Sequence, residues 1–155
     1  MNKDFVICGF SGVGKSTAGE TYRNVVDLES SSFSKIYENG EVVGNNPDFP
    51  SNYVDKLCSL MANHNEETHY YLLSCHEEVR KELQKRGIKY LIVLPYSNEK
   101  NEYIKRWFKR GSSIEFITNM EAKWYRMMRT CNEDEAPKLF LEPNEYISDL
   151  FTSIK

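Results

Sequence analysis

The sequence predicts an α/β fold with three layers, in which helices cover both faces of a parallel sheet of about five strands. Short, continuous apolar segments alternate along the chain with segments of helical periodicity, an order that is typical of a parallel sheet buried on both faces. A glycine-rich loop also follows the first apolar segment directly. Because ligands of such sheets bind at the carboxyl ends of the strands, we expect a functional site beside this loop.

Five apolar segments are the expected strands, and they comprise Phe5–Cys8, Val25–Leu28, Tyr70–Leu73, Tyr90–Leu94 and Lys138–Leu141. The expected helices run from Lys15 to about Arg23, through Tyr53, Leu57, Leu60 and Met61, over Glu77–Arg86 and Asn98–Arg110, from Ser112 to about Arg129, and over Glu145–Ile154. Gly87 and Gly111 are placed to end two of these helices, and Ser112 and Glu115 have the spacing of a capping box. Asn39-Gly40 predicts a small hairpin, because this pair tolerates the positive φ angles of a tight turn.

The composition indicates one ordinary domain and excludes several classes of protein. The chain has 155 residues, 40% of them hydrophobic, and no repeat, low-complexity tract or linker, so residues 1–155 are predicted to form a single domain. A net charge of −3 and a pI of about 5.7 disfavour a nucleic-acid binder, which needs a basic surface. No segment is long enough to cross a bilayer, and the first residues lack the apolar core of a signal peptide. The four cysteines form no CxxC pair, so we expect a reduced cytoplasmic protein with neither a zinc site nor a disulfide framework.

The loop that follows the first strand carries the strongest motif of the chain. From Gly9 to Ser16 it reads Gly-Phe-Ser-Gly-Val-Gly-Lys-Ser and fits the pattern GxxxxGK[ST]. Glycines let such a backbone curl so that several N–H groups point at one phosphate chain, and the next helix favours the same negative charge with its N-terminus. In this pattern Lys15 reaches the β- and γ-phosphates, and the Ser16 hydroxyl joins the shell of a Mg²⁺ ion. The predicted site for ATP and Mg²⁺ comprises Gly9, Ser11, Gly12, Val13, Gly14, Lys15, Ser16 and Thr17.

Two acids follow the second expected strand, where a parallel sheet would place them beside this loop. Asp27 and Glu29 are two residues apart, so on an extended segment they point to the same side. We expect Asp27 to be the carboxylate on the Mg²⁺ side and Glu29 to contact the phosphoryl acceptor or act as its base. The third strand ends at Ser74, where many nucleotide-hydrolysing enzymes carry an acid, and this strengthens the case for Asp27. His76 is a weaker candidate base.

A pair of arginines lies on the helix expected over residues 98–110. Arg106 and Arg110 are one turn apart and share a face. Lys105 and Lys109 lie nearly opposite the apolar side, and the two arginines are expected between, at the rim of the buried side, where they can reach into a cleft. The expected apolar stripe comprises Tyr103, Ile104, Trp107 and Phe108. Because guanidinium groups bind phosphoryl oxygens in forked geometry and stabilise charge that develops during transfer, we predict catalytic roles for Arg106 and Arg110.

The loop, the acid pair and the arginine helix together resemble the small P-loop kinases, which include nucleoside monophosphate kinases and the shikimate- and gluconate-kinase types. Residues 27–31 and 46–53 also resemble small P-loop proteins of bacteriophages and their hosts. The resemblance implies a P-loop NTPase fold of the nucleoside-monophosphate-kinase type and catalytic work for Lys15. It also implies that residues 30–52 form an acceptor-side insertion and that residues 98–115 form a lid-like helix corner. The chain departs from the pattern in its short first helix, in Ser74, and in having a helix corner in place of a long lid insertion.

The predicted function is that of a kinase which moves the γ-phosphoryl group of ATP to a small acceptor, most simply a nucleoside monophosphate. One alternative is a kinase of a small hydroxylated metabolite. Another is a non-catalytic regulatory module whose bound ATP sets its affinity for a protein partner. A signalling GTPase is disfavoured because the chain has neither an NKxD nor a DxxG motif.

Overall fold

Five parallel strands form the main sheet of the computed structural model, which describes residues 4–63 and 67–151. Their order across the sheet is β2-β5-β1-β6-β7. The strands are β1 (Phe5–Gly9), β2 (Val25–Asp27), β5 (Tyr70–Ser74), β6 (Leu91–Pro95) and β7 (Lys138–Leu141). In the central strand, Ile7 lies opposite Leu72 of β5 and Leu91 of β6. The parallel sheet predicted from the apolar segments is therefore confirmed.

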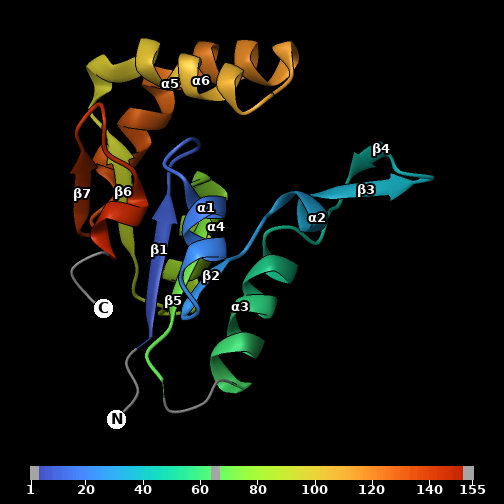
Figure 1. Cartoon of the computed structure of the whole chain (residues 1–155). Coiled ribbons are helices and arrows are strands. Elements are labelled where there is room, and N and C mark those ends of the chain that lie inside the picture. Colours follow the sequence, from blue (N-terminus) through green and yellow to red (C-terminus); the bar gives the residue numbers. More distant parts are fainter. Residues whose placement is uncertain (1–3, 64–66, 152–155) are drawn as a thin grey trace.

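Helices cover both faces of this sheet. On one face lie α1 (Lys15–Thr21) and the carboxyl-terminal turn η2 (Ile147–Leu150), which contact each other. On the other lie α3 (Ser51–Asn63), α4 (Glu77–Lys85) and α6 (Ile114–Glu133), which contact one another in that order. The division follows from right-handed crossovers, because the connection from β1 to β2 crosses the sheet in the opposite direction from the later ones. The turn η1 (Ser97–Glu99) leads into α5 (Lys100–Lys109), and α5 lies over the carboxyl end of the sheet (Figure 1).

An aromatic cluster joins the glycine-rich loop to α5 and α6. Phe10 of the loop is fully buried, and its ring centre lies 5.2 Å from that of Trp124 and 6.1 Å from that of Tyr103. Trp107 completes the cluster and donates a hydrogen bond from Nε1 to the carbonyl of Ser11 at 3.2 Å. Burial of each such ring contributes about 1.5–3 kcal/mol. The loop is thus anchored on the helices above it.

A hairpin projects from the body of the molecule between β2 and α3 (Figure 1). It consists of the short helix α2 (Ser31–Ser34) followed by β3 (Lys35–Glu38) and β4 (Glu41–Asn45), which pair antiparallel. Asn39 and Gly40 adopt φ angles of 52° and 81°, so the hairpin predicted from this pair is confirmed. Four large apolar side chains of the hairpin are exposed, namely Ile36, Tyr37, Val42 and Val43.

Several predicted details of the helices were wrong. Ser113 caps α6 instead of Ser112, because its Oγ accepts a hydrogen bond from the N–H of Phe116 at 3.1 Å. The helix expected over residues 98–110 is divided into η1 and α5. Its buried face is also rotated, since Phe108 of the expected apolar stripe is 57% exposed whereas Arg106 is only 7% exposed.

The last expected helix, Glu145–Ile154, is only the single turn η2 within the described residues, and residues 152–154 lie outside them. The backbone N–H of Ile147 donates to the carbonyl of Val13 at 2.8 Å, and the N–H of Tyr146 donates to the carboxylate of Asp149 at 2.9 Å. The first bond holds this segment against the glycine-rich loop. The second lies within the turn, which Tyr146 enters with an extended backbone. In the described part of the chain, no helix combines the length and apolar character needed to cross a membrane.

Candidate functional site

A cavity of about 450 Å³ lies at the carboxyl ends of β1, β2 and β5. The predicted loop residues that line it are Gly9, Ser11, Gly12, Gly14, Lys15, Ser16 and Thr17, and the other predicted residues that line it are Asp27, Glu29, Arg106 and Arg110. The structure thus brings together side chains that are up to about a hundred positions apart in sequence. Val13 does not line the cavity, because its side chain is fully buried in the core.

The glycines of the loop are required by close packing as well as by backbone angles. Gly12 and Gly14 have φ angles of 98° and 94°, in the region that side chains with a Cβ disfavour. A Cβ on Gly12 would come within 3.0 Å of both Tyr103 and Trp107, and one on Gly14 would come within 3.0 Å of the ring of Tyr146. The aromatic side chains that cover the loop therefore leave no room for a Cβ at either position.

Lys15 reaches back across the curl of the loop. Its Nζ donates to the carbonyl of Gly9 at 2.7 Å and more weakly to that of Phe10 at 3.4 Å. Burial lowers the pKa of Lys15, while the negative charges of Asp27 and Glu29 oppose this shift. A partly buried ammonium held by carbonyls at the wall of a cavity is well placed to receive an anionic group.

The two acids lie at different depths in the same cavity. Asp27 is half-buried and lines the cavity together with Ser16. Burial raises the pKa of Asp27, and the positive charge of Lys15 opposes that shift. Glu29 is exposed, and its Oε1 accepts the backbone N–H of Ser31 at 3.0 Å. The shared side predicted for the two acids agrees with their common place in the cavity wall.

Arg106 is buried and clamps two segments together. One terminal nitrogen donates to the carbonyl of Gly12 at 3.0 Å, and the other donates to the carbonyls of Pro143 at 2.9 Å and Glu145 at 2.7 Å. The guanidinium lies 3.9 Å from the ring centre of Tyr146. Arg106 therefore joins the glycine-rich loop to the segment after β7, a structural role that the prediction of a rim arginine reaching into a cleft had missed.

Arg110 is exposed and lines the cavity, which agrees with the rim position predicted for it. Its Nε donates to Ser112 Oγ at 2.8 Å, and a terminal nitrogen donates to Ser11 Oγ at 3.0 Å. Both acceptors are serine hydroxyls in exposed bonds, so Arg110 can exchange them for another acceptor at little cost. Of the two arginines, Arg110 is the one free to turn toward a bound anion.

The comparisons with known proteins agree with this geometry at the level of the fold. A similar solved structure is that of the tunicamycin resistance protein of Deinococcus radiodurans, with a TM-score of 0.61 and 14% sequence identity. The similarity covers 99% of this chain and 94% of that protein. The two proteins share a P-loop kinase-like fold. No family model and no curated protein matches the chain.

Other residues that line the cavity of this kinase-like fold were not predicted to belong to the site. Ser74 Oγ donates to Ser30 Oγ at 2.7 Å, which joins the ends of β5 and β2 beside the acids. The remaining lining residues are Cys75, Phe116, Met120, Met127 and Tyr146. Met120 and Met127 are seven positions apart, so their helical spacing could have indicated a shared face. The serine pair and Tyr146 depend on contacts between distant segments and gave no local signal.

His76, the weaker candidate base, also lines the cavity. It keeps exposed surface at the cavity mouth. The protein atoms packed around the imidazole disfavour its charged form and lower the pKa of His76. A neutral imidazole at this place is able to accept a proton.

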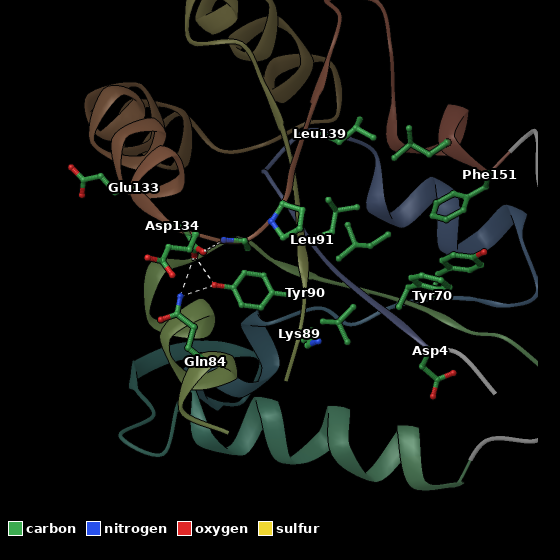
Figure 2. A pocket seen from close by; sticks show the side chains of 17 residues that line it. Asp4, Tyr70, Gln84, Lys89, Tyr90, Leu91, Glu133, Asp134, Leu139 and Phe151 are labelled. Atoms are coloured by element: carbon green, nitrogen blue, oxygen red, sulfur yellow. Dashed lines mark hydrogen bonds between the residues drawn. The ribbon is translucent and has the colours of Figure 1, made fainter. Parts of the chain in front are cut away.

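A larger cavity, of about 1030 Å³, lies at the opposite, amino-terminal edge of the sheet (Figure 2). Its wall is mostly apolar and includes Leu91, Leu139 and Phe151, with the phenol of Tyr90 bonded to Asp134 at 2.6 Å. Ligands of parallel sheets bind at the carboxyl ends of the strands, and this cavity has no part of the glycine-rich loop in its wall. We therefore assign the candidate site to the smaller cavity.

Proposed function

We propose that this chain is an ATP-dependent phosphotransferase that moves the γ-phosphoryl group to a hydroxyl group of a small acceptor. The observation that carries the proposal is the cavity whose wall contains Ser16 and Asp27 together with Lys15. This cavity places Ser16 and Asp27, which would approach a metal ion, beside Lys15, which would approach the phosphates. The kinase-like fold supports the same reaction class.

Each residue would have a distinct task in this reaction. The loop N–H groups and Lys15 would hold the β- and γ-phosphates. Arg110 would turn from Ser11 toward the phosphoryl group as charge develops on its oxygens. Glu29 or His76 would accept the proton of the acceptor hydroxyl, because both lie in the same cavity wall.

The residues present fit Mg²⁺. Ser16 and Asp27 offer a hydroxyl and a carboxylate, the oxygen donors that this ion prefers, and Mg²⁺ usually takes one or two carboxylates together with substrate phosphates. Consistent with such sharing, the described residues contain no cluster of three or more His, Cys, Asp or Glu side chains able to hold a metal ion by themselves. When bound, the ion would neutralise charge on the β- and γ-phosphates.

Charge at the acceptor end favours an uncharged hydroxyl compound over a nucleoside monophosphate. Asp27 and Glu29 place two acidic groups there, whereas Lys15 and Arg110 belong to the loop and to the end of α5. In the segment 30–52 the basic residue is Lys35, which lies on the projecting hairpin and bonds to a side chain of β4. A phosphate group on the acceptor would therefore meet like charge at this end.

The neutral part of the wall fits the same class of acceptor. The bonded hydroxyls of Ser30 and Ser74 can pair with hydroxyl groups, and Met120 and Met127 supply an apolar surface. Lys123 of α6 is a nearby basic residue, since its charge affects the pKa of His76. It does not line the cavity, so it offers no direct contact to a phosphate group on the acceptor. The solved neighbour is named for resistance to tunicamycin, which supports chemistry on a small molecule.

A screen of matched acceptors tests the proposal. ADP release from ATP and Mg²⁺ is measured with nucleosides against their monophosphates and with sugars against their phosphates. We expect an acceptor without phosphate to stimulate release most, and Lys105→Ala, on the exposed side of α5, to leave the rate unchanged. Greater stimulation by nucleoside monophosphates would overturn the acceptor class alone. Tight ATP binding with no acceptor-stimulated release would favour the regulatory module.

A further inference from the structure

Two buried thiols meet behind the phosphate cavity, although they are 56 positions apart in sequence. The sulfur atoms of Cys75 and Cys131 lie 3.6 Å apart. Cys75 directly follows β5 and lines the cavity, whereas Cys131 lies in the last turn of α6. The pair therefore joins the carboxyl edge of the sheet to the helix that supplies Phe116, Met120 and Met127 to the cavity wall.

Arg80 holds the backbone around both thiols in place. Its Nε donates to the carbonyl of Cys75 at 3.2 Å. Its terminal nitrogens donate to the carbonyl and the hydroxyl of Thr130, at 3.2 and 2.9 Å, and to the carboxylate of Asp134 at 2.9 Å. Since the side chains of Arg80 and Asp134 are each only 3% exposed, this brace is rigid and keeps the two sulfurs in contact.

The two thiols differ in their tendency to lose a proton. A hydrogen bond from Cys75 lowers the pKa of Cys131, burial opposes that shift, and the charge of Arg80 assists it. The pKa of Cys75 is raised by the same hydrogen bond and by its burial. Because the thiolate is the reactive form of cysteine, Cys131 is the thiol that attacks first. Cys75 is the thiol that then attacks the oxidised sulfur of Cys131.

We propose that Cys75 and Cys131 form a disulfide when hydrogen peroxide enters through the wall of the phosphate cavity beside Cys75 and reaches Cys131, whose sulfur lies 3.6 Å from that of Cys75. The sulfur of Cys131 attacks a peroxide oxygen, so that an S–O bond forms, the O–O bond breaks and the departing oxygen leaves as water. The sulfur of Cys75 then displaces the hydroxyl of this sulfenic acid as a second water. Two thiols lose two electrons and two protons in all, and hydrogen peroxide is reduced to two waters.

Only a small movement is needed to form this bond. A disulfide measures about 2.05 Å between sulfurs, so the two atoms must approach by about 1.5 Å. The new bond would fix α6 to the edge of the sheet between Ser74 and His76, both of which line the cavity. Bound nucleotide would cover this entry route and slow the formation of the disulfide. The expected effect of nucleotide is the one part of the proposal that rests on the proposed function.

Hydrogen peroxide and peptide mass spectrometry under non-reducing conditions test the proposal on the full chain. We expect two of the four thiols to be lost, a linked pair of peptides that contain Cys75 and Cys131, and recovery of both thiols with a reductant. Cys75→Ser and Cys131→Ser should each abolish the link, with Cys75→Ala and Cys131→Ala as second variants. Cys58→Ser is the matched control and should keep it, because Cys58 lies on α3 outside the pair.

Two results would overturn the proposal. One is a folded parent chain that keeps four thiols under peroxide, or whose Cys131 is oxidised to sulfinic acid without any link to Cys75. The other concerns the entry route: in a chain shown separately to bind ATP, an equal rate of linkage with and without ATP and Mg²⁺ would exclude access through the cavity. Failure of ATP to bind at all would count against the proposed function and leave the disulfide itself intact.

Discussion

At the scale of single residues, the site depends on charges that are partly removed from water. Lys15 and Asp27 oppose each other's pKa shifts, so each keeps its charge more readily in the presence of the other. Ser16 lines the same cavity as these two residues. Lys15 and Asp27 therefore form one electrostatic unit in the cavity wall.

Asp27→Asn tests the metal side of this unit. The amide keeps the size of the carboxylate and removes its charge, so we expect the Mg²⁺ concentration for half-maximal turnover to rise roughly tenfold, with a smaller change in nucleotide affinity. A Mg²⁺ titration of ADP release measures the first quantity, and titration with a fluorescent ATP analogue measures the second. The same midpoint in variant and parent would remove Asp27 from the metal site.

The two arginines of α5 are predicted to fail in different ways when they are replaced by alanine. Arg106→Ala leaves three partly buried carbonyls without their donor and empties the space of a buried side chain, so the free energy of unfolding should fall by about 3 kcal/mol. Arg110→Ala removes an exposed side chain and should change stability by less than about 0.5 kcal/mol while lowering kcat.

Urea unfolding and steady-state kinetics on both variants separate these effects. Arg110→Lys should restore only part of kcat, because an ammonium cannot bridge two oxygens in forked geometry. Lys109→Ala is the control on the exposed side of the same helix. A stable Arg106→Ala protein, or an Arg110→Ala protein with the kcat of the parent, would contradict the division of roles.

At the scale of elements, the loop, α5 and the segment after β7 behave as one packed unit. The loop contacts α5 through Trp107 and Arg106, and it contacts the last segment through the bond from Ile147 to Val13. The hairpin is held at its base, where Asn52 of α3 donates to the carbonyl of Phe33 at 3.0 Å, and its strands project beyond that contact. Isolated two-stranded hairpins are only marginally stable in water, and the side chains of β3 and β4 are almost all exposed.

Hydrogen exchange should separate the hairpin from the sheet. We expect the amides of β3 and β4 to exchange through local opening, with protection far below that of β1 and β5, and to gain protection when both substrates are bound. The central strand β1 serves as the internal reference. Equal protection of hairpin and core, with and without ligands, would exclude the acceptor-side role of residues 30–52.

At the scale of the whole molecule, patterns local in sequence predicted the sheet well and the contacts between distant segments poorly. Apolar runs such as Leu91–Leu94 revealed buried strands, and Asn39-Gly40 revealed the hairpin, because a few neighbouring residues determine each. The burial of Arg106 could not be predicted in this way. It depends on carbonyls at Pro143 and Glu145, which only the closed fold brings to α5.

The candidate site shows the same division. The motif from Gly9 to Ser16 predicted the loop because its chemistry is contained in eight consecutive residues. The serine pair and the thiol pair escaped notice, since each joins residues that are 44 or 56 positions apart. The cysteines form no CxxC pair in the sequence, and the fold alone brings Cys75 and Cys131 together.

The most direct test of the central claim is acceptor-stimulated ADP release by the parent chain and by Lys15→Ala, measured side by side. Lys15 contributes charge at the cavity wall, so its loss should leave the thermal unfolding transition within a few degrees of the parent. The account predicts that the folded variant releases ADP at least about 100-fold more slowly, the order of loss seen when one preorganised donor is removed from a transition state. ADP release by a folded Lys15→Ala protein at the rate of the parent would contradict it.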